Sequence, residues 1–201
     1  MSEQIRPESP LVERIGGERR AESPAEAGVT LRERPFLGYL NLRGDPADSA
    51  FTGAVREFSG LDLPTEPNTF VENDRCSAIW LGPNEWYLVV AAGEELDAVE
   101  RLEQALEGRH FAVNDLTSGL TTVHLSGSNA RDLLQKGCTL DLHPRAFGAG
   151  QCAQTLVAKA GVVILHRGDE PAYELIVRRS FADYLYLWIE DAALEYGLAV
   201  A

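Results

Sequence analysis

A hairpin of two strands followed by an amphipathic helix occurs twice in this chain, and the repeat restricts the folds that it can adopt. The first copy joins a hairpin over residues 78–90 to a helix over 94–106. The second copy joins strand runs 156–166 and 172–178, also read as one hairpin, to a helix that begins at Ser180. Antiparallel hairpins interrupted by helices predict an α+β fold, with antiparallel sheets and the helices packed on one face. Two split βαβ units side by side fit this order.

The two helices carry apolar side chains at helical spacing, which predicts the faces that they bury. In the first helix we expect the buried face to consist of Leu96, Val99, Leu102 and Leu106. In the second helix we expect it to consist of Phe181, Tyr184, Leu185, Trp188 and Ala192. Ser180 and Asp183 have the spacing of a capping box, so we expect both side chains to cap the second helix.

Residues 114–147 lie between the two copies and contain a strand and a short helix. Alternation over residues 121–125 predicts a half-buried strand. Ser128 or Asn129 is expected to cap the following helix with its side chain, and Gly137 to end that helix.

Composition excludes several classes of function. The net charge of −13 disfavours nucleic acid and an anionic membrane surface, because both attract clustered Lys and Arg. No apolar run approaches the ~20 residues that span a bilayer. Cys76, Cys138 and Cys152 are odd in number and have no metal-binding spacing, so we expect no zinc site and a reducing, cytoplasmic location.

Residues 1–34 differ from the rest of the chain, because they are rich in charge, Pro and Gly and poor in large apolar side chains. Such a segment buries too little surface to offset its ordering entropy. We therefore predict an extended, flexible N-terminal arm over 1–34 and one folded domain over 35–201. Two alternatives stay open for the arm: a disordered leader, or a segment that orders along another subunit.

Candidate catalytic groups are few, and each has a plainer interpretation. His124 lies on a strand, where a lone histidine is usually hydrogen-bonded rather than catalytic. Asp141 and His143 could form a pair that orients a base, but no nucleophile accompanies them in the sequence, and a structured turn is favoured. Cys138 follows a helix end, where a thiol is poorly activated, and Cys76 is expected in the core.

Two further features are candidate sites. Gly148-Ala149-Gly150 lacks the strand and helix that flank a dinucleotide-binding loop. Trp80, Trp86 and Tyr87 form an aromatic group suited to a protein interface, although alternation places at least one of the two Trp in the core, and we favour Trp86. No residue of this chain is therefore assigned a catalytic, cofactor-binding or metal-binding role.

The blocks WLGPNEWYLVV, DLTSGLTTVHLSGSNARDLLQKGCTLDLHPRAF and YELIVRRSFADYLYLWIEDAALEYGL resemble the gamma subunits of heterotetrameric sarcosine oxidases. The resemblance covers residues 36–198 and excludes the N-terminal arm. The chain is more distantly similar to the folate-binding part of aminomethyltransferases of the glycine cleavage system. That second resemblance implies tandem ferredoxin-like units, in agreement with the hairpin–helix repeat.

The resemblance implies a function for an assembly rather than for this chain. Sarcosine oxidases of this type demethylate sarcosine oxidatively to glycine, produce hydrogen peroxide, and with tetrahydrofolate give 5,10-methylenetetrahydrofolate. FAD, FMN, NAD and the folate site belong to other subunits, and no catalytic role attaches to gamma subunits. We therefore expect a non-catalytic subunit that assembles with alpha, beta and delta subunits.

A different class of function is a stand-alone, folate-dependent one-carbon transferase. Aminomethyltransferases place an acidic residue near the strand that leads into the first hairpin, and Asp74 lies close to that position. The residues after Asp74 are not acidic. Lys136-Gly137-Cys138 resembles a signature of an iron–sulfur repair family, but it continues Thr-Leu-Asp-Leu, which departs from that family's pattern.

Overall fold

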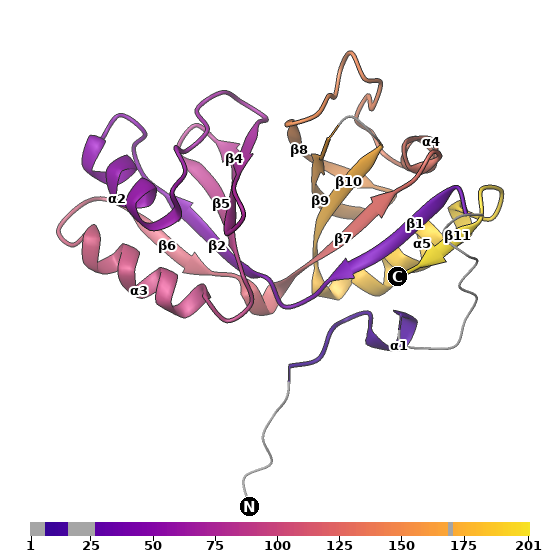
Figure 1. The fold of residues 1–201 in the computed structure, drawn as a ribbon, viewed down its shortest axis with the longest axis horizontal. Helices are drawn as coiled ribbons and strands as arrows, with labels where there is room; N and C mark the ends of the chain where they lie inside the picture. The colour runs from indigo at the N-terminus through magenta and orange to yellow at the C-terminus, as the bar shows by residue number, and fades with distance from the viewer. Residues whose placement is uncertain (1–6, 16–26, 169–170) are drawn as a thin grey trace, which may run out of the picture.

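The computed structural model describes residues 7–15, 27–168 and 171–201 as two β-sheets that meet at an angle, with helices on their outer faces (Figure 1). The six-stranded sheet has the order β11-β1-β7-β10-β9-β8, and the five-stranded sheet has the order β3-β4-β5-β2-β6. Neighbouring strands are antiparallel except β1 and β11, which pair in parallel. The expected α+β class with predominantly antiparallel sheets is confirmed.

The elements follow one another along the chain in a simple order. The helices are α1 (Val12–Ile15), α2 (Ser49–Ser59), α3 (Glu95–Ala105), η1 (Thr117–Gly119), α4 (Ala130–Gln135) and α5 (Arg179–Ala192). The strands of the five-stranded sheet are β2 (Gly38–Arg43), β3 (Phe70–Glu72), β4 (Cys76–Gly82), β5 (Glu85–Val90) and β6 (Ala112–Asp115). Those of the six-stranded sheet are β1 (Val29–Arg34), β7 (Leu120–Ser126), β8 (Cys152–Val157), β9 (Ala160–His166), β10 (Ala172–Arg178) and β11 (Leu198–Val200).

The chain passes between the two sheets at two short connections. Residues 35–37 link β1 to β2, and residues 116–119 link β6 to β7. Both connections lie at the vertex where the sheets meet (Figure 1). The five-stranded sheet is thus built from one continuous segment between the two connections, whereas the six-stranded sheet combines β1 with the strands that follow the second connection.

Apolar side chains form three layers. One cluster lies between the six-stranded sheet and helices α4 and α5, and a second lies between the five-stranded sheet and helices α2 and α3. The third cluster lies between the sheets and includes Tyr39, Ile79, Leu165 and Ile176. Each sheet therefore carries its helices on one face and turns the other face toward its neighbour.

The first predicted hairpin is confirmed as β4 and β5, whose register pairs Trp80 with Trp86. Trp86 is fully buried, and its indole N–H donates to the carbonyl of Pro64 at 2.8 Å. Trp80 is only half-buried and packs against the cluster between the five-stranded sheet and helices α2 and α3, to which Trp86 belongs. The interpretation of Trp86 as a core residue is correct, because the strand directs it toward α2, where it contacts Phe51.

The second predicted hairpin needs a correction. β9 and β10 pair as expected, but residues 156–157 end a separate strand, β8, that turns into β9 at Ala158. Ala158 has a φ of 52°, in the left-handed region that favours glycine. The apolar run over residues 156–166 was read as one strand because this turn contains no Gly, Pro or Asn.

The expected boundary at residue 34 is also wrong in part. Val29–Arg34 forms β1, which pairs with β7 on one side and β11 on the other. Val29 and Leu31 are fully buried, so these residues belong to the folded sheet. Leu11 is likewise fully buried against the same cluster. Residues 1–6 and 16–26 lie outside the described residues, and the extended arm over them stays a prediction.

The predicted helix faces and caps are only partly correct. Leu102 and Leu106 are buried, whereas Leu96 is 70% exposed and Phe181 is 40% exposed. In α5 the buried face consists of Ala182, Leu185, Tyr186, Ile189 and Ala192. The prediction is correct for Leu185 and Ala192, whereas Tyr184 and Trp188 are only partly buried.

Two predicted caps are absent, since other partners take the side chains. Helix α5 begins at Arg179, and Asp183 pairs with Arg14 rather than closing a capping box. Asn129 occupies the N-cap of α4 without a side-chain cap, and its amide donates to Asp132 at 3.3 Å.

Candidate functional site

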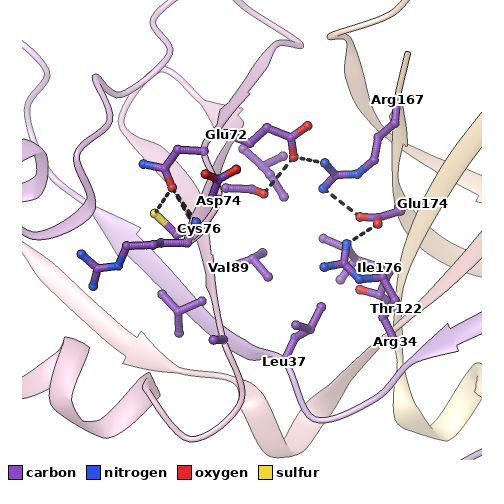
Figure 2. Close-up of a pocket in the computed structure, with 16 residues that line it drawn as sticks. Arg34, Leu37, Glu72, Asp74, Cys76, Val89, Thr122, Arg167, Glu174 and Ile176 are labelled. Carbon is purple, nitrogen blue, oxygen red and sulfur yellow. Dashed lines mark hydrogen bonds and ion pairs between the residues drawn. The ribbon is translucent and has the colours of Figure 1, made fainter. Parts of the chain in front are cut away.

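A cleft opens between the two sheets, with charged side chains on both walls (Figure 2). It has a volume of about 190 Å³. Glu72 and Asp74 line the wall of the five-stranded sheet, whereas Arg34, Arg167 and Glu174 line the wall of the six-stranded sheet. Its interior is lined by the aliphatic side chains Leu37, Ile79, Val89 and Ile176. This combination of an apolar floor and a polar rim is typical of small-molecule sites.

Glu174 is the centre of the charged network on the six-stranded wall. It stands on β10 with a side chain only 5% exposed. Its Oε1 accepts from Arg34 Nη1, and its Oε2 lies 2.9 Å from Arg167 Nη2. A carboxylate this deeply buried needs such partners, because burial without them strongly disfavours its charged form.

Arg167 joins the two walls of the cleft. Its Nη1 pairs with Glu72, which stands on the opposite sheet. Its guanidinium also lies over the ring of Phe70, 5.3 Å from the ring centroid. The Nε atom of Arg167 is buried and has no hydrogen-bond acceptor among the described residues. An unsatisfied buried donor is unfavourable, so this guanidinium has unused capacity for an anionic group.

Tyr39 forms a second polar contact between the sheets. Its hydroxyl lies 2.6 Å from Thr122 Oγ1, and either atom can donate. Burial raises the pKa of Tyr39 to about 12, the largest effect, which the Thr122 hydrogen bond only partly opposes. The tyrosine is therefore neutral at physiological pH. It links the two sheets by a hydrogen bond and does not act as a base.

The structure brings three of the sequence candidates to the cleft. Asp74 and Cys76 line it directly. His124 stands on β7 with Nδ1 3.9 Å from Glu174 Oε1. Burial lowers the pKa of His124 and outweighs the opposing charge of Glu174. Burial also raises the pKa of Cys76, whose Sγ donates to the carbonyl of Ser59 at 3.4 Å, so neither group is activated as a nucleophile.

The other candidates lie elsewhere and have structural contacts. Asp141 Oδ1 accepts from the backbone N–H of His143 at 2.9 Å. The Nδ1 of His143 accepts in turn from the backbone N–H of Arg145 at 3.2 Å. These contacts stabilise a turn, as expected. The Asp141 carboxylate makes no hydrogen bond with the His143 ring, so the two side chains do not form a pair that orients a catalytic base. Cys138 is partly exposed, and its Sγ lies 3.9 Å from Thr155 Oγ1.

Sequence reasoning missed the main charged groups of the cleft. The sequence places Arg34 in the arm, and the strand pattern over residues 172–178 gives Glu174 no special role. A charged residue in the run Ala172–Arg178 was the available signal, because a buried strand tolerates a carboxylate only when a cation accompanies it. Arg167 and Glu72 gave no signal, since their pairing depends on how the two sheets meet.

The described part of the chain holds neither a metal-binding cluster nor a membrane-spanning helix. Among residues 7–15, 27–168 and 171–201, no group of three His, Cys, Asp or Glu side chains is placed to hold a metal ion. Within the same residues, no helix is both long enough and apolar enough to cross a bilayer.

Comparison with protein families gives one clear match. The profile of the sarcosine oxidase, gamma subunit family matches residues 43–195. The sarcosine oxidase subunit gamma of Corynebacterium sp. strain P-1 is 33% identical over 195 residues, which cover 94% of each chain. That of Corynebacterium sp. strain U-96 is 32% identical and covers 95% of this chain and 92% of its own length.

Solved structures agree with the sequence comparison. A chain of the heterotetrameric sarcosine oxidase from Corynebacterium sp. U-96 superposes with a TM-score of 0.84 and 29% identity, covering 96% of this chain and 97% of its own length. The glycine cleavage aminomethyltransferase of Bartonella henselae gives a TM-score of 0.62 at 16% identity, covering 88% of this chain and 48% of its own. At that identity the second match shows a shared fold alone.

Proposed function

The chain belongs to the sarcosine oxidase gamma subunit family, and from this premise we propose that it is a non-catalytic subunit of a heterotetrameric sarcosine oxidase. The observation that carries the proposal is the match of nearly the whole chain to one chain of such a heterotetramer. In this proposal the alpha, beta and delta subunits hold FAD, FMN, NAD and tetrahydrofolate. The assembly oxidises sarcosine to glycine with oxygen and passes on the one-carbon unit.

The contacts of the candidate groups support a structural role. The Cys76 and Cys152 thiols have pKa values raised by burial, that of Cys152 to about 12. Asp141 and His143 are engaged in a turn. Three free cysteines agree with the cytoplasm as the proposed compartment.

We also propose a finer description of the fold. Each sheet with its helices corresponds to one ferredoxin-like unit, and the two units stand in tandem as in the folate-binding part of aminomethyltransferases. The shared fold with the Bartonella enzyme supports this description. The folded domain in this proposal begins at β1, and residues preceding it form an arm whose segment 8–15 packs on the domain.

Co-purification tests the proposed function. A tagged chain, expressed with the subunits encoded beside it, should retain a yellow complex that forms hydrogen peroxide from sarcosine. The same chain expressed alone should be colourless and inactive. If the other subunits assemble into a fully active oxidase that leaves the tagged chain behind, the proposal is wrong.

Trp80 offers a matched pair of variants for the docking surface. Trp80 is half-buried, whereas Trp86 on the paired strand is fully buried. If Trp80 contacts another subunit, Trp80→Ala should weaken retention of the complex even well below its own melting temperature, which the lost packing against the core lowers. Trp86→Phe should lower the melting temperature of the chain. At temperatures below that melting temperature, it should retain the complex as the wild type does. Equal retention by Trp80→Ala and wild type would remove Trp80 from the docking surface.

A further inference from the structure

Arg167 binds two carboxylates that differ in their freedom to move. Glu174 lies on the same sheet and is 5% exposed, whereas Glu72 reaches from the opposite sheet and is 41% exposed. Glu72 also ends a strand of only three residues at the edge of its sheet. Glu72 is therefore the partner that another carboxylate could replace on Arg167.

The arginines of this wall have donors that the chain leaves unused. The Nε of Arg167 is buried without an acceptor among the described residues. Arg34 donates to Glu174 through Nη1, and its side chain is 41% exposed. A carboxylate binds a guanidinium best through two parallel hydrogen bonds, which fix its orientation as well as its energy.

The balance of charge in the cleft favours an anion once Glu72 turns away. The charged residues lining the cleft are then three arginines (Arg34, Arg75 and Arg167) against two carboxylates (Asp74 and Glu174), which leaves one positive charge. The net positive charge would repel a cation. A neutral ligand would leave the arginine N–H groups without a charged acceptor.

The interior limits the rest of the ligand. Leu37, Val89 and Ile176 line the cleft beside the charged groups (Figure 2), and burial of aliphatic carbon against them is favourable. A volume of about 190 Å³ is below the range of roughly 300–1,000 Å³ typical of drug-sized ligands. The occupant that fits is therefore a few carbons long.

We propose that the cleft between the sheets binds a small aliphatic monocarboxylate, whose carboxylate takes the place of Glu72 on Arg167. The aliphatic part lies against Leu37, Val89 and Ile176. Glu72 acts as a built-in competitor that occupies the site when the ligand is absent. This site belongs to the chain itself and does not depend on its role in a larger assembly.

A titration of the full chain with propionate tests the site, followed through the methyl NMR signals of Leu37, Val89 and Ile176. Glu72→Gln removes the competitor and should bind propionate about fivefold more tightly, the factor expected for loss of one partly exposed ion pair. Asp74→Asn is the matched control: it removes one negative charge from the cleft but frees no donor of Arg167, so it should tighten binding much less than Glu72→Gln does. Arg167→Gln should not bind.

A second measurement does not depend on the stability of any variant. With the wild-type chain, affinity should rise from acetate to propionate to butyrate, since each carbon buries more aliphatic surface. Propylammonium should not shift the same signals. The proposal fails if Glu72→Gln binds no more tightly than Asp74→Asn. It fails equally if propylammonium or inorganic phosphate binds as well as propionate, or if no carboxylate shifts these methyl signals.

Discussion

Arg14 and Asp183 form an ion pair at 2.6 Å although 169 residues separate them in the sequence. The pair fixes α1 beside α5, and neighbouring contacts extend the attachment. Ser9 donates to Glu33 of β1, and Arg179 donates to the carbonyl of Glu8 at 2.6 Å. Segment 8–15 is therefore held on the six-stranded sheet and its helix by contacts at both ends.

Leu11→Ala should destabilise the chain, because Leu11 is fully buried in the cluster under that segment. Leucine truncation in a core lowers the free energy of unfolding by about 2–5 kcal/mol, and we expect the lower end because a terminal segment can detach and relax. Arg14→Gln, which breaks only the exposed pair, should cost less than about 1 kcal/mol. Urea denaturation measures both. Equal midpoints for Leu11→Ala and the wild type would show that the segment is not docked in solution.

Glu174→Gln should reduce stability, because Arg34 loses its carboxylate partner and Arg167 keeps only Glu72. Breaking a fully buried pair costs about 3–5 kcal/mol, but the exposure of Arg34 reduces the effect, so we expect about 2 kcal/mol. Glu85→Gln provides a control, since Glu85 pairs with Arg43 at a more exposed place on the five-stranded sheet. Denaturant midpoints compare the two variants. A loss for Glu85→Gln as large as that for Glu174→Gln would contradict the assigned role of burial.

Tyr39 should make stability depend on alkaline pH. Its folded pKa of about 12 exceeds the ordinary value of 10.0, so folding favours the neutral form. The corresponding stabilisation is fully present below pH 10.0 and is lost as pH rises toward 12. Over that interval the wild type should lose up to about 1.4 kcal/mol per pH unit more than Tyr39→Phe. Unfolding measured from pH 9 upward in small steps tests this, and parallel curves for the two proteins would refute it.

The three cysteines should differ in reactivity toward thiol reagents. Burial raises the pKa of Cys152 to about 12 and also raises that of Cys76, so few thiolates form on either at pH 8. Cys138 is partly exposed. The native chain should therefore release one fast equivalent from Ellman's reagent, the denatured chain three, and native Cys138→Ser none. A fast second equivalent in the native protein would show that the strands around Cys76 or Cys152 open readily.

Local sequence patterns predicted the elements better than their boundaries. The hairpin at β4 and β5 has strong strand formers and a Pro-Asn turn, so its position could be read directly. The turn at Ala158 could not, because nothing in its residue types announces a left-handed backbone. The sequence places Val29–Arg34 in the arm because four of its six residues are charged or polar, yet β7 and β11 pair with it from either side.

The charged cleft could not be predicted from sequence patterns, because tertiary packing alone forms it. Arg34, Glu72 and Arg167 come from three distant segments, and only the packing of one sheet against the other brings them together. Asp183 illustrates the same limit on a smaller scale. Its spacing from Ser180 indicated a cap, but a tertiary partner, Arg14, offers a full positive charge and takes the side chain instead.

The two crossings at the vertex have a consequence for how the protein is made. β1 leaves the ribosome before any of the five-stranded sheet, yet its partners are β7 and β11, and β11 follows every other strand in the sequence. The six-stranded sheet therefore cannot be completed until β11 has been synthesised, and its closing contacts are long-range, which slows folding. A ribosome-bound or C-terminally truncated chain leaves an edge of β1 unpaired, where chaperones or proteases can recognise it.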